Sequence, residues 1–227
     1  MTFVYRPPSF SGNNLDLGDR VVKLVFSMRR PQVALIGAFL DDDECAALIE
    51  CGADRLEPAT VFELSDGSKT ISSFRTSWHA KLERAKDTVV SRIEARTSRL
   101  AGLPDSHGEL IEVIRYQEGQ TYRPHWDWFD PETDGGSRRI AAFGQRVATV
   151  ILYLNDGFEG GSTVLSRIGL DVRPQKGSAL FFCNVDEMGQ GNRRTLHAGA
   201  PVLSGEKWIA TRWFASRPQA ANVLAGF

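Results

Sequence analysis

Two features of the sequence predict a single, mainly β domain with supporting helices. After about residue 108, short segments rich in β-branched and aromatic residues follow one another with turn residues and no helical pattern between them. Such a run is typical of a sandwich or barrel. The helical patterns come earlier, and no flexible linker separates the two parts. We therefore expect one domain over residues 31–227, with helical support at 41–105 and the β core at 108–215.

The first forty residues predict an arm followed by a strand. Residues 1–20 are rich in Pro, Ser, Gly and Asn, and a loose N-terminal arm is expected over residues 1–30. The apolar run VALIGAFL at 33–40 then predicts a buried strand.

Two helices are predicted before the β core. Asp41 stands before a short amphipathic segment and has the side chain of an N-cap, so a helix is expected over 41–52. A longer helix is expected within 83–103, where apolar residues recur at roughly helical spacing. Gly102 and Pro104 end this second helix.

The strands of the β core are predicted from five segments of the kind described above. One of them contains Cys183, which we expect to be an ordinary core residue. The segments are residues 109–117, 146–155, 162–168, 178–185 and 207–214.

Composition excludes several functional classes. The chain has 227 residues, of which 42% are hydrophobic and 24% charged, as in ordinary globular proteins. The formal net charge of −1 gives no reason to expect a nucleic acid or membrane partner, and the apolar runs are too short to span a bilayer. Three scattered cysteines predict no disulfide framework, and no signal peptide is evident. We expect a cytoplasmic protein.

The strongest chemical signal is a possible metal site. His125 and Asp127 alternate in YRPHWDWF, so on a strand both side chains point to one face. His197, far downstream, is one of four histidines and can supply a third ligand. Two imidazoles and one carboxylate form the facial ligand set of non-haem Fe(II) oxygenases. The other two histidines, His79 and His107, have no such context and are expected at the surface.

The surroundings of the His-x-Asp pair support this interpretation. Such a tripeptide alone is common, but Pro124 stiffens the chain before it, and three aromatic residues can enclose a dry pocket, namely Tyr122, Trp126 and Trp128. Residues 130–145 follow directly; they are polar and contain glycine, and we expect a mobile loop over the site.

Lys207 is a second candidate site residue. It lies ten residues after His197 and begins an apolar segment that predicts a half-buried strand. A buried lysine requires an anionic partner. The carboxylate of a bound dicarboxylic acid would serve, although most lysines are simply solvated.

Five segments in order resemble the prolyl 4-hydroxylases, which are 2-oxoglutarate- and Fe(II)-dependent dioxygenases. The similarity extends from about residue 70 to residue 215 and is to the compact bacterial or viral type. The segments are FRTSWHA (74–80), VIRYQEGQTYRPHWDWF (113–129), RVATVILYLNDGFEGGSTVL (146–165), KGSALFF (176–182) and LHAGAPVLSGEKWIATRWF (196–214).

The resemblance implies a fold and a role for each matching residue. The fold would be a double-stranded β-helix, the jelly roll shared with cupins, with iron at its mouth. The iron ligands would be His125, Asp127 and His197. The residues binding 2-oxoglutarate would be Lys207, Tyr116 and Thr163.

The resemblance also assigns residues on the substrate side. Tyr122 would stand beside the iron and Trp213 near the substrate. The positions that shape the peptide side would be Arg146, Glu109, Arg75 and Ser77. For Arg146 and Glu109 a plain salt bridge at a strand edge is an equal alternative.

The activity implied is hydroxylation of an unactivated C–H bond, most simply the 4-position of a prolyl residue in a peptide or protein. Fe(II), 2-oxoglutarate and O2 would be required, with release of succinate and CO2 and with ascorbate as reductant. Asp127 favours hydroxylation over halogenation, because a halogenase needs that position vacant for halide.

Three alternatives stay open from the sequence. The same chemistry on a free amino acid or small natural product would require a closed lid, whereas an open channel between residues 60–80 and 130–145 would favour a peptide. A second alternative is a non-catalytic jelly-roll binding module, which the intact triad opposes. A cupin-like protein with another metal would leave Lys207 unexplained. The sequence makes no prediction of the oligomeric state.

Overall fold

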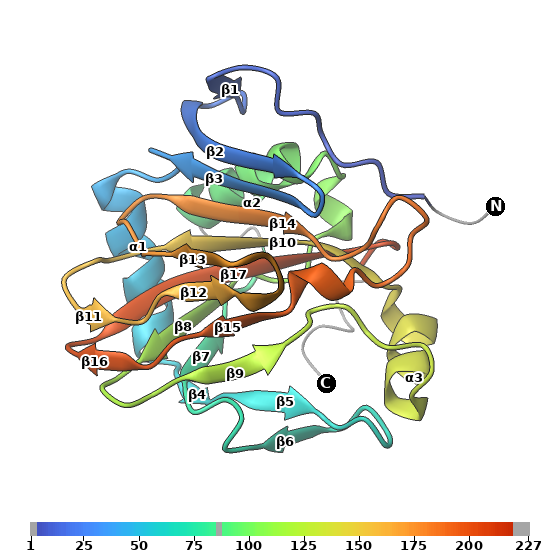
Figure 1. The fold of residues 1–227 in the computed structure, drawn as a ribbon. Helices are drawn as coiled ribbons and strands as arrows, with labels where there is room; N and C mark the ends of the chain where they lie inside the picture. Colours follow the sequence, from blue (N-terminus) through green and yellow to red (C-terminus); the bar gives the residue numbers. More distant parts are fainter. Residues whose placement is uncertain (1–3, 85–87, 220–227) are drawn as a thin grey trace.

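The strands form two facing antiparallel sheets in the computed structural model, which describes residues 4–84 and 88–219 (Figure 1). Nine strands make the larger sheet. In spatial order they are β1 (Asn14–Asp16), β2 (Val21–Arg29), β3 (Gln32–Gly37), β14 (Ala179–Cys183), β10 (Arg146–Tyr153), β17 (Lys207–Ala215), β8 (Glu112–Tyr116), β7 (Trp78–Lys81) and β4 (Glu57–Pro58).

Four strands make the smaller sheet, in the order β13 (Leu170–Val172), β12 (Thr163–Leu165), β15 (His197–Gly199) and β9 (Tyr122–His125). Two further pairs are β11 (Glu159–Gly160) with β16 (Val202–Ser204), and β5 (Thr60–Phe62) with β6 (Lys69–Ile71). The helices are α1 (Asp42–Ala53), α2 (Thr88–Ala101) and α3 (Asp134–Phe143), with short 3₁₀ turns at Asp105–His107, Ser166–Ile168 and Arg193–Thr195. None of the helices in the described ranges has the length and apolar character needed to cross a bilayer.

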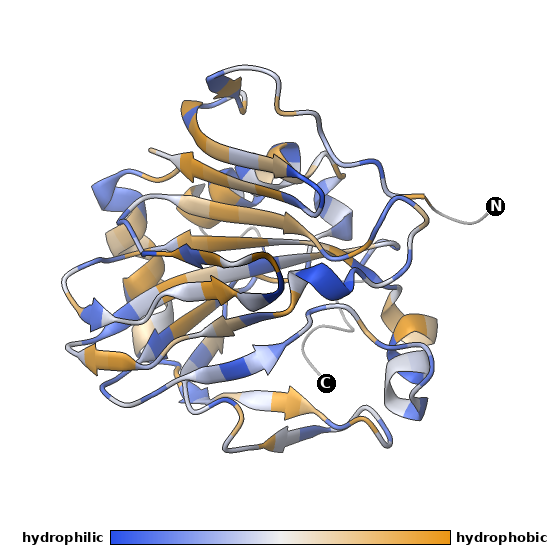
Figure 2. Cartoon of the chain, viewed as in Figure 1, coloured by the Kyte–Doolittle hydropathy of each residue, from blue (hydrophilic) through white to orange (hydrophobic). Residues whose placement is uncertain are grey.

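The larger sheet is buried on both faces. Along β10, Ala148, Val150 and Leu152 pack in a core with residues of α1 and α2. Ile151 and Tyr153 point the other way, into a second core that includes residues of β12 and β13. Alternate residues of a strand face opposite sides, so every residue of β10 is buried. Figure 2 shows β10 and β14 in hydrophobic colours, whereas β9 is largely hydrophilic.

The predicted fold class is confirmed: the chain is mainly β, with supporting helices, and its two facing sheets form a jelly roll. Each of the six predicted strand segments contains a strand. The helix predicted over 41–52 is α1, whose N-cap Asp41 and residue Glu44 form a capping box. Cys183 is buried, as predicted.

The prediction of a loose N-terminal arm is wrong where the structure describes strands. β1 and β2 extend the larger sheet, with β2 pairing along β3. In β2, buried or half-buried Val22, Leu24, Phe26 and Met28 alternate with exposed residues. This period of two is the mark of a strand, and it outweighs the turn-forming residues that precede it.

The prediction of a mobile loop at 130–145 is also wrong, because residues 134–143 form α3. Thr133 caps this helix by accepting a hydrogen bond from the Gly136 amide at 3.0 Å. Gly135 lies against the turn between β5 and β6, where a Cβ atom would come within 2.4 Å of the Glu63 carbonyl oxygen. Glycine is therefore required for close approach, and the Gly135 amide donates to the Leu64 carbonyl at 2.9 Å.

β9 is an edge strand of the smaller sheet, and residues 74–76 cover its free side. The Arg123 amide donates to the Phe74 carbonyl at 2.9 Å, and the Thr76 amide donates to the Thr121 carbonyl at 3.1 Å. Arg75 also forms an isolated bridge with Tyr122. The segment FRTSWHA, residues 74–80, therefore lies beside the strand that ends at His125.

Arg96 of α2 joins its helix to α1 and to the loops that contain Asp19 and Phe39. Its side chain is 2% exposed, and its guanidinium donates to both Glu44 carboxylate oxygens at 2.8 and 2.7 Å. It also donates to the Asp19 carboxylate and the Phe39 carbonyl, each at 2.6 Å. A buried cation with this many acceptors is stabilising only as long as each partner stays in place.

Replacing Arg96 by alanine is predicted to lower the free energy of unfolding by about 3–5 kcal/mol, because the buried Glu44 carboxylate would lose its two short hydrogen bonds and keep Arg20, at 3.4 Å, as its nearest cation. Arg92 on the same helix is a suitable control, since its side chain is 51% exposed and 3.9 Å from Glu44. Arg92→Ala is expected to change the unfolding free energy by less than about 1 kcal/mol. Urea denaturation measures both, and equal effects would contradict the prediction.

Candidate metal centre and its pocket

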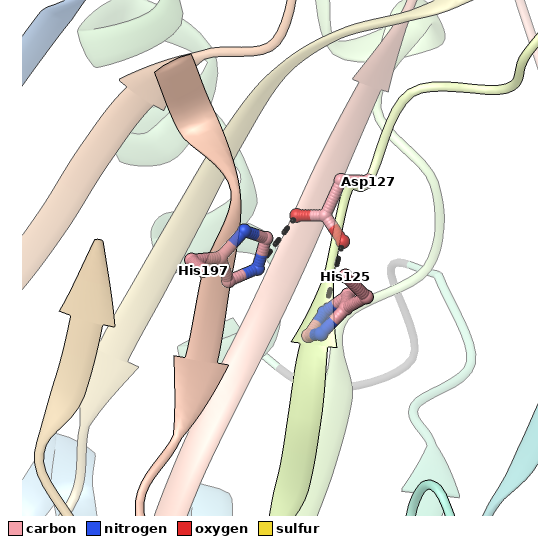
Figure 3. A group of neighbouring side chains, drawn as sticks. All are labelled: His125, Asp127 and His197. Carbon is pink, nitrogen blue, oxygen red and sulfur yellow. Dashed lines mark ion pairs between the residues drawn. The ribbon is translucent and has the colours of Figure 1, made fainter. Parts of the chain in front are cut away.

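Two strands of the smaller sheet bring the three predicted metal ligands together. His125 ends β9 and His197 begins β15, and the antiparallel pairing sets these two histidines opposite each other. Asp127 lies two residues beyond the strand end. Figure 3 shows the three side chains pointing toward a common point. Their ligand atoms all lie within 4.8 Å of one another.

The donor geometry fits a metal ion. Nε2 of His125 is 3.7 Å from Oδ1 of Asp127, and Nε2 of His197 is 3.6 Å from Oδ2. These separations are too long for strong hydrogen bonds. Two donors that each lie about 2.1 Å from one ion are separated by about 3–4 Å, depending on the angle between them. Two imidazoles and a carboxylate leave the opposite coordination face open, as in Fe(II) oxygenases.

Both histidines are oriented by their other ring nitrogen. Nδ1 of His125 lies 2.8 Å from the Arg123 carbonyl oxygen, and Nδ1 of His197 lies 2.9 Å from the Thr195 carbonyl oxygen. A carbonyl only accepts, so Nδ1 carries the proton and the Nε2 lone pair is free to bind a metal. Burial lowers the pKa of His125 to about 3, with the nearby His197 as the next cause, so its imidazole is neutral near pH 7.

Asp127 is tied to the larger sheet by residues that the sequence reasoning missed. Thr149 of β10 donates from its hydroxyl to Oδ2 of Asp127 at 2.7 Å, and Asn184 donates to that hydroxyl at 2.8 Å. Burial opposes ionisation, but the two histidines, Arg146 and the Thr149 hydrogen bond together hold the pKa of Asp127 below its usual value. A polar Thr in the apolar run RVATVILY was the available signal.

Tyr122, expected beside the iron, and Trp213, expected near the substrate, both line the pocket beside the metal donors. The Tyr122 ring stacks on the His125 ring with centroids 3.5 Å apart. Burial raises the pKa of Tyr122, so its hydroxyl stays protonated. The Arg146 guanidinium lies 4.1 Å from the centre of the Trp213 ring, which fixes the plane of the indole.

The pocket has a volume of about 630 Å³ and lies between α3, the β5–β6 pair and the larger sheet. His125 and Asp127 reach it, as do the predicted substrate residues Arg75, Glu109 and Arg146. Arg146 binds Glu109 with two hydrogen bonds, at 2.6 and 2.8 Å, so the predicted salt bridge is present. Trp126 and Trp128 also line the pocket.

The fourth predicted substrate residue, Ser77, is buried and accepts a hydrogen bond from Arg75 at 3.3 Å. Arg75 in turn donates to Glu112 at 2.6 Å, and Nδ1 of His79 lies 2.9 Å from the same carboxylate oxygen. The prediction that His79 is a surface residue is therefore wrong, because its side chain pairs with a buried glutamate. His107 is half-buried, with Nδ1 2.9 Å from the Ala215 carbonyl.

Lys207 is buried at the start of β17, between the two sheets. Its Nζ lies 5.0 Å from the centre of the Tyr116 ring, and Tyr116 is its partner on β8. Among residues 4–84 and 88–219, no carboxylate lies within 4.0 Å of this ammonium. Burial lowers the pKa of Lys207 to about 7. An anionic ligand would remove this penalty.

Thr163 and Tyr116 are both buried, and Thr163 has a partner that the sequence reasoning missed. The Tyr153 hydroxyl donates to the Thr163 hydroxyl at 2.9 Å, joining the two sheets. Gly161, two residues before Thr163, packs against the Lys207 side chain, where a Cβ would lie 3.1 Å from Cδ. The three residues predicted to hold a dicarboxylate therefore belong to one buried region.

Known proteins match this chain over the same region. Residues 111–215 match the model of the 2OG-Fe(II) oxygenase superfamily. Probable prolyl 4-hydroxylase 7 of Arabidopsis thaliana is 33% identical over 81% of this chain and 62% of its own. Prolyl 4-hydroxylase 5 of the same plant is 34% identical over 93% of this chain and 77% of its own. The chain thus spans less than two thirds of the first relative's length.

A solved structure has the same fold. The viral collagen prolyl hydroxylase of Paramecium Bursaria Chlorella virus-1, in its 2OG complex, aligns with a TM-score of 0.61 and 28% sequence identity. The alignment covers 80% of this chain and 94% of the viral one. The jelly-roll fold is therefore shared with a viral enzyme.

Replacing Thr149 by valine is predicted to weaken binding of a divalent metal by about 10–100-fold, because Asp127 would lose the hydroxyl that orients it. Calorimetric titration with Mn(II) measures this directly. Thr149→Ser keeps the hydroxyl and serves as the control, with affinity close to that of the unmodified protein. Unchanged affinity in Thr149→Val would contradict the prediction.

Proposed function

The chain belongs to the prolyl 4-hydroxylase family of the 2OG-Fe(II) oxygenase superfamily, and from this membership we propose that it is a 2-oxoglutarate- and Fe(II)-dependent dioxygenase that hydroxylates prolyl residues. The observation that carries the proposal is the convergence of His125, Asp127 and His197 at the edge of the pocket. A ligand set of this kind leaves room for both a keto acid and dioxygen.

The three side chains would hold Fe(II) through Nε2 of His125, Nε2 of His197 and the ionised carboxylate of Asp127. When bound, Fe(II) and 2-oxoglutarate supply the oxidation: one oxygen atom of O2 enters the substrate C–H bond, the other enters succinate, and CO2 leaves. Thr149 keeps the carboxylate in place. Ascorbate is the reductant that we expect to keep the metal in the ferrous state.

Lys207 would bind the distal carboxylate of 2-oxoglutarate, with Tyr116 and Thr163 beside it. The support is that Lys207 is 2% exposed and has no carboxylate partner among the described residues. An ammonium in such a place is costly unless an anion joins it. The co-substrate would thereby be oriented from its far end, while its keto-acid end reaches the metal.

The substrate would lie in the pocket, against Tyr122 and Trp213. Their rings, held by His125 and Arg146, form an apolar wall next to the metal donors. A proline ring is largely apolar and packs well on aromatic faces. Arg146, Glu109, Arg75 and Ser77 are already bonded to protein partners, so we propose that they shape the pocket and contact the substrate through their remaining edges.

A second candidate function is hydroxylation of a free amino acid or small natural product, and one observation favours it. Residues 60–80 and α3 are not separated by an open channel, because Arg139 donates to the Gly67 carbonyl at 2.9 Å and the Gly135 amide donates to Leu64. This contact covers the pocket on one side. A peptide would pass beneath it, whereas a small molecule would be enclosed.

The protein supplied with Fe(II), 2-oxoglutarate and ascorbate is expected to add one oxygen atom to proline-containing peptides and to release an equivalent of succinate. Removing either ligand side chain, in His125→Ala or Asp127→Ala, is predicted to abolish both products. Asp171→Ala, which removes an exposed carboxylate on β13, is the control. Mass spectrometry of peptide and of free proline measures the outcome. Modification of proline alone would favour the second candidate.

Apparent affinity for 2-oxoglutarate is predicted to fall as pH rises above 7. With a pKa of about 7 in the free protein, Lys207 is charged below that pH and neutral above it. Binding of the dianion requires the charged form, so affinity should drop by about ten-fold for each pH unit above 7. Michaelis constants measured from pH 6 to 9 test this. Lys207→Arg remains charged and should remove the dependence; a flat profile in the unmodified protein would refute the prediction.

A further inference from the structure

The cations that line the pocket are not all paired with a carboxylate. Five lysine or arginine side chains among the described residues reach it, and these are Lys69, Arg75, Lys81, Arg139 and Arg146. Two of the five are fully paired: Arg75 with Glu112 at 2.6 Å, and Arg146 with Glu109 at 2.6 and 2.8 Å. Glu109 and Glu112 are therefore already paired with arginines.

Neither Lys69 nor Lys81 has such a partner among the described residues. Lys69 begins β6 and Lys81 ends β7. Within the described parts of the chain, no carboxylate oxygen lies within 4.0 Å of either ammonium, although Glu63 and Asp130 also line the pocket. Partial burial and the charge of Lys81 lower the pKa of Lys69 to about 8. Two neighbouring cations repel each other, and an anion between them would relieve the repulsion.

Arg139 adds to the same wall from α3. Its guanidinium lies 3.9 Å from the centre of the Phe62 ring, and Phe62 pairs with Lys69 across β5 and β6. Its hydrogen bonds go to the neutral Gly67 carbonyl, so its charge is not compensated there. Three cations on the wall formed by β6, β7 and α3 therefore have no carboxylate within 4.0 Å among the described residues, namely Lys69, Lys81 and Arg139.

We propose that this wall is an anion subsite, in which Lys69 and Lys81 bind the side-chain carboxylate of an acidic residue in the peptide substrate. The proposal rests on the proposed function and extends it to the substrate's sequence. The co-substrate does not account for these lysines, because Lys207 is available for its carboxylate in a separate buried region. Exposed Phe74 and Trp126, which also line the pocket, provide apolar surface for the rest of the peptide.

The test uses fluorescent nine-residue peptides with a central proline and a single glutamate moved through the flanking positions, each with a glutamine twin. Binding to the protein loaded with Mn(II) and 2-oxoglutarate is measured by anisotropy at low ionic strength. At one or two positions the glutamate peptide is expected to bind about ten-fold more tightly than its twin. Lys69→Met/Lys81→Met should bring that ratio close to one. Lys23→Met, an exposed lysine on β2, should preserve it.

Equal binding of the twins at every position, or a ratio unchanged in the double variant, would overturn the anion subsite. The proposed function is judged separately from the same peptides, by adding Fe(II) and O2 and measuring the gain of one oxygen atom. Absence of that gain would reject prolyl hydroxylation, while the binding ratio would still decide whether the lysines select an acidic ligand.

Discussion

The antiparallel register of β9 and β15 is the constraint on which the whole site depends. It sets His125 opposite His197, and the ring centroids of the two lie 4.2 Å apart. A slip of one residue would turn one imidazole to the other face of the sheet. Asp127 completes the group only because Thr149, on the facing sheet, holds its carboxylate. The packing of the two sheets therefore determines the metal geometry.

Charge around the site is divided between paired and unpaired groups. The buried arginines Arg75 and Arg146 are held by glutamates, so they act as fixed parts of the pocket wall. Lys207 has no carboxylate within 4.0 Å among the residues that the structure describes, and burial lowers its pKa. Leaving an ion unpaired in a folded protein costs several kcal/mol. The fold tolerates that cost at the position where an anionic co-substrate would remove it.

Local signals made much of this molecule predictable. Each correct prediction came from a short-range pattern that is interpretable without the fold: the N-cap Asp41, the apolar strands and the His-x-Asp pair. Apart from the N-terminal arm, where the local alternation of β2 was overlooked, the errors concern groups whose surroundings are set at long range. Thr149 meets Asp127, and His79 meets Glu112, only after the strands have paired. α3 was not predicted because its first turn contains two glycines. Gly135 is required by its close contact with residues 63–67, and Gly136 by its close contact with Asp130.

The segment that covers the free edge of β9 also prevents this strand from pairing with a strand of another chain. An open edge strand is a template for pairing with another chain, and evolution usually blocks it. Here residues 74–76 occupy the outward-facing donors and acceptors, and Pro124 contributes no amide hydrogen at all. The strand that carries a metal ligand cannot recruit a foreign strand without first losing this segment. The same few backbone hydrogen bonds therefore block pairing with another strand and hold in place the strand that ends at His125.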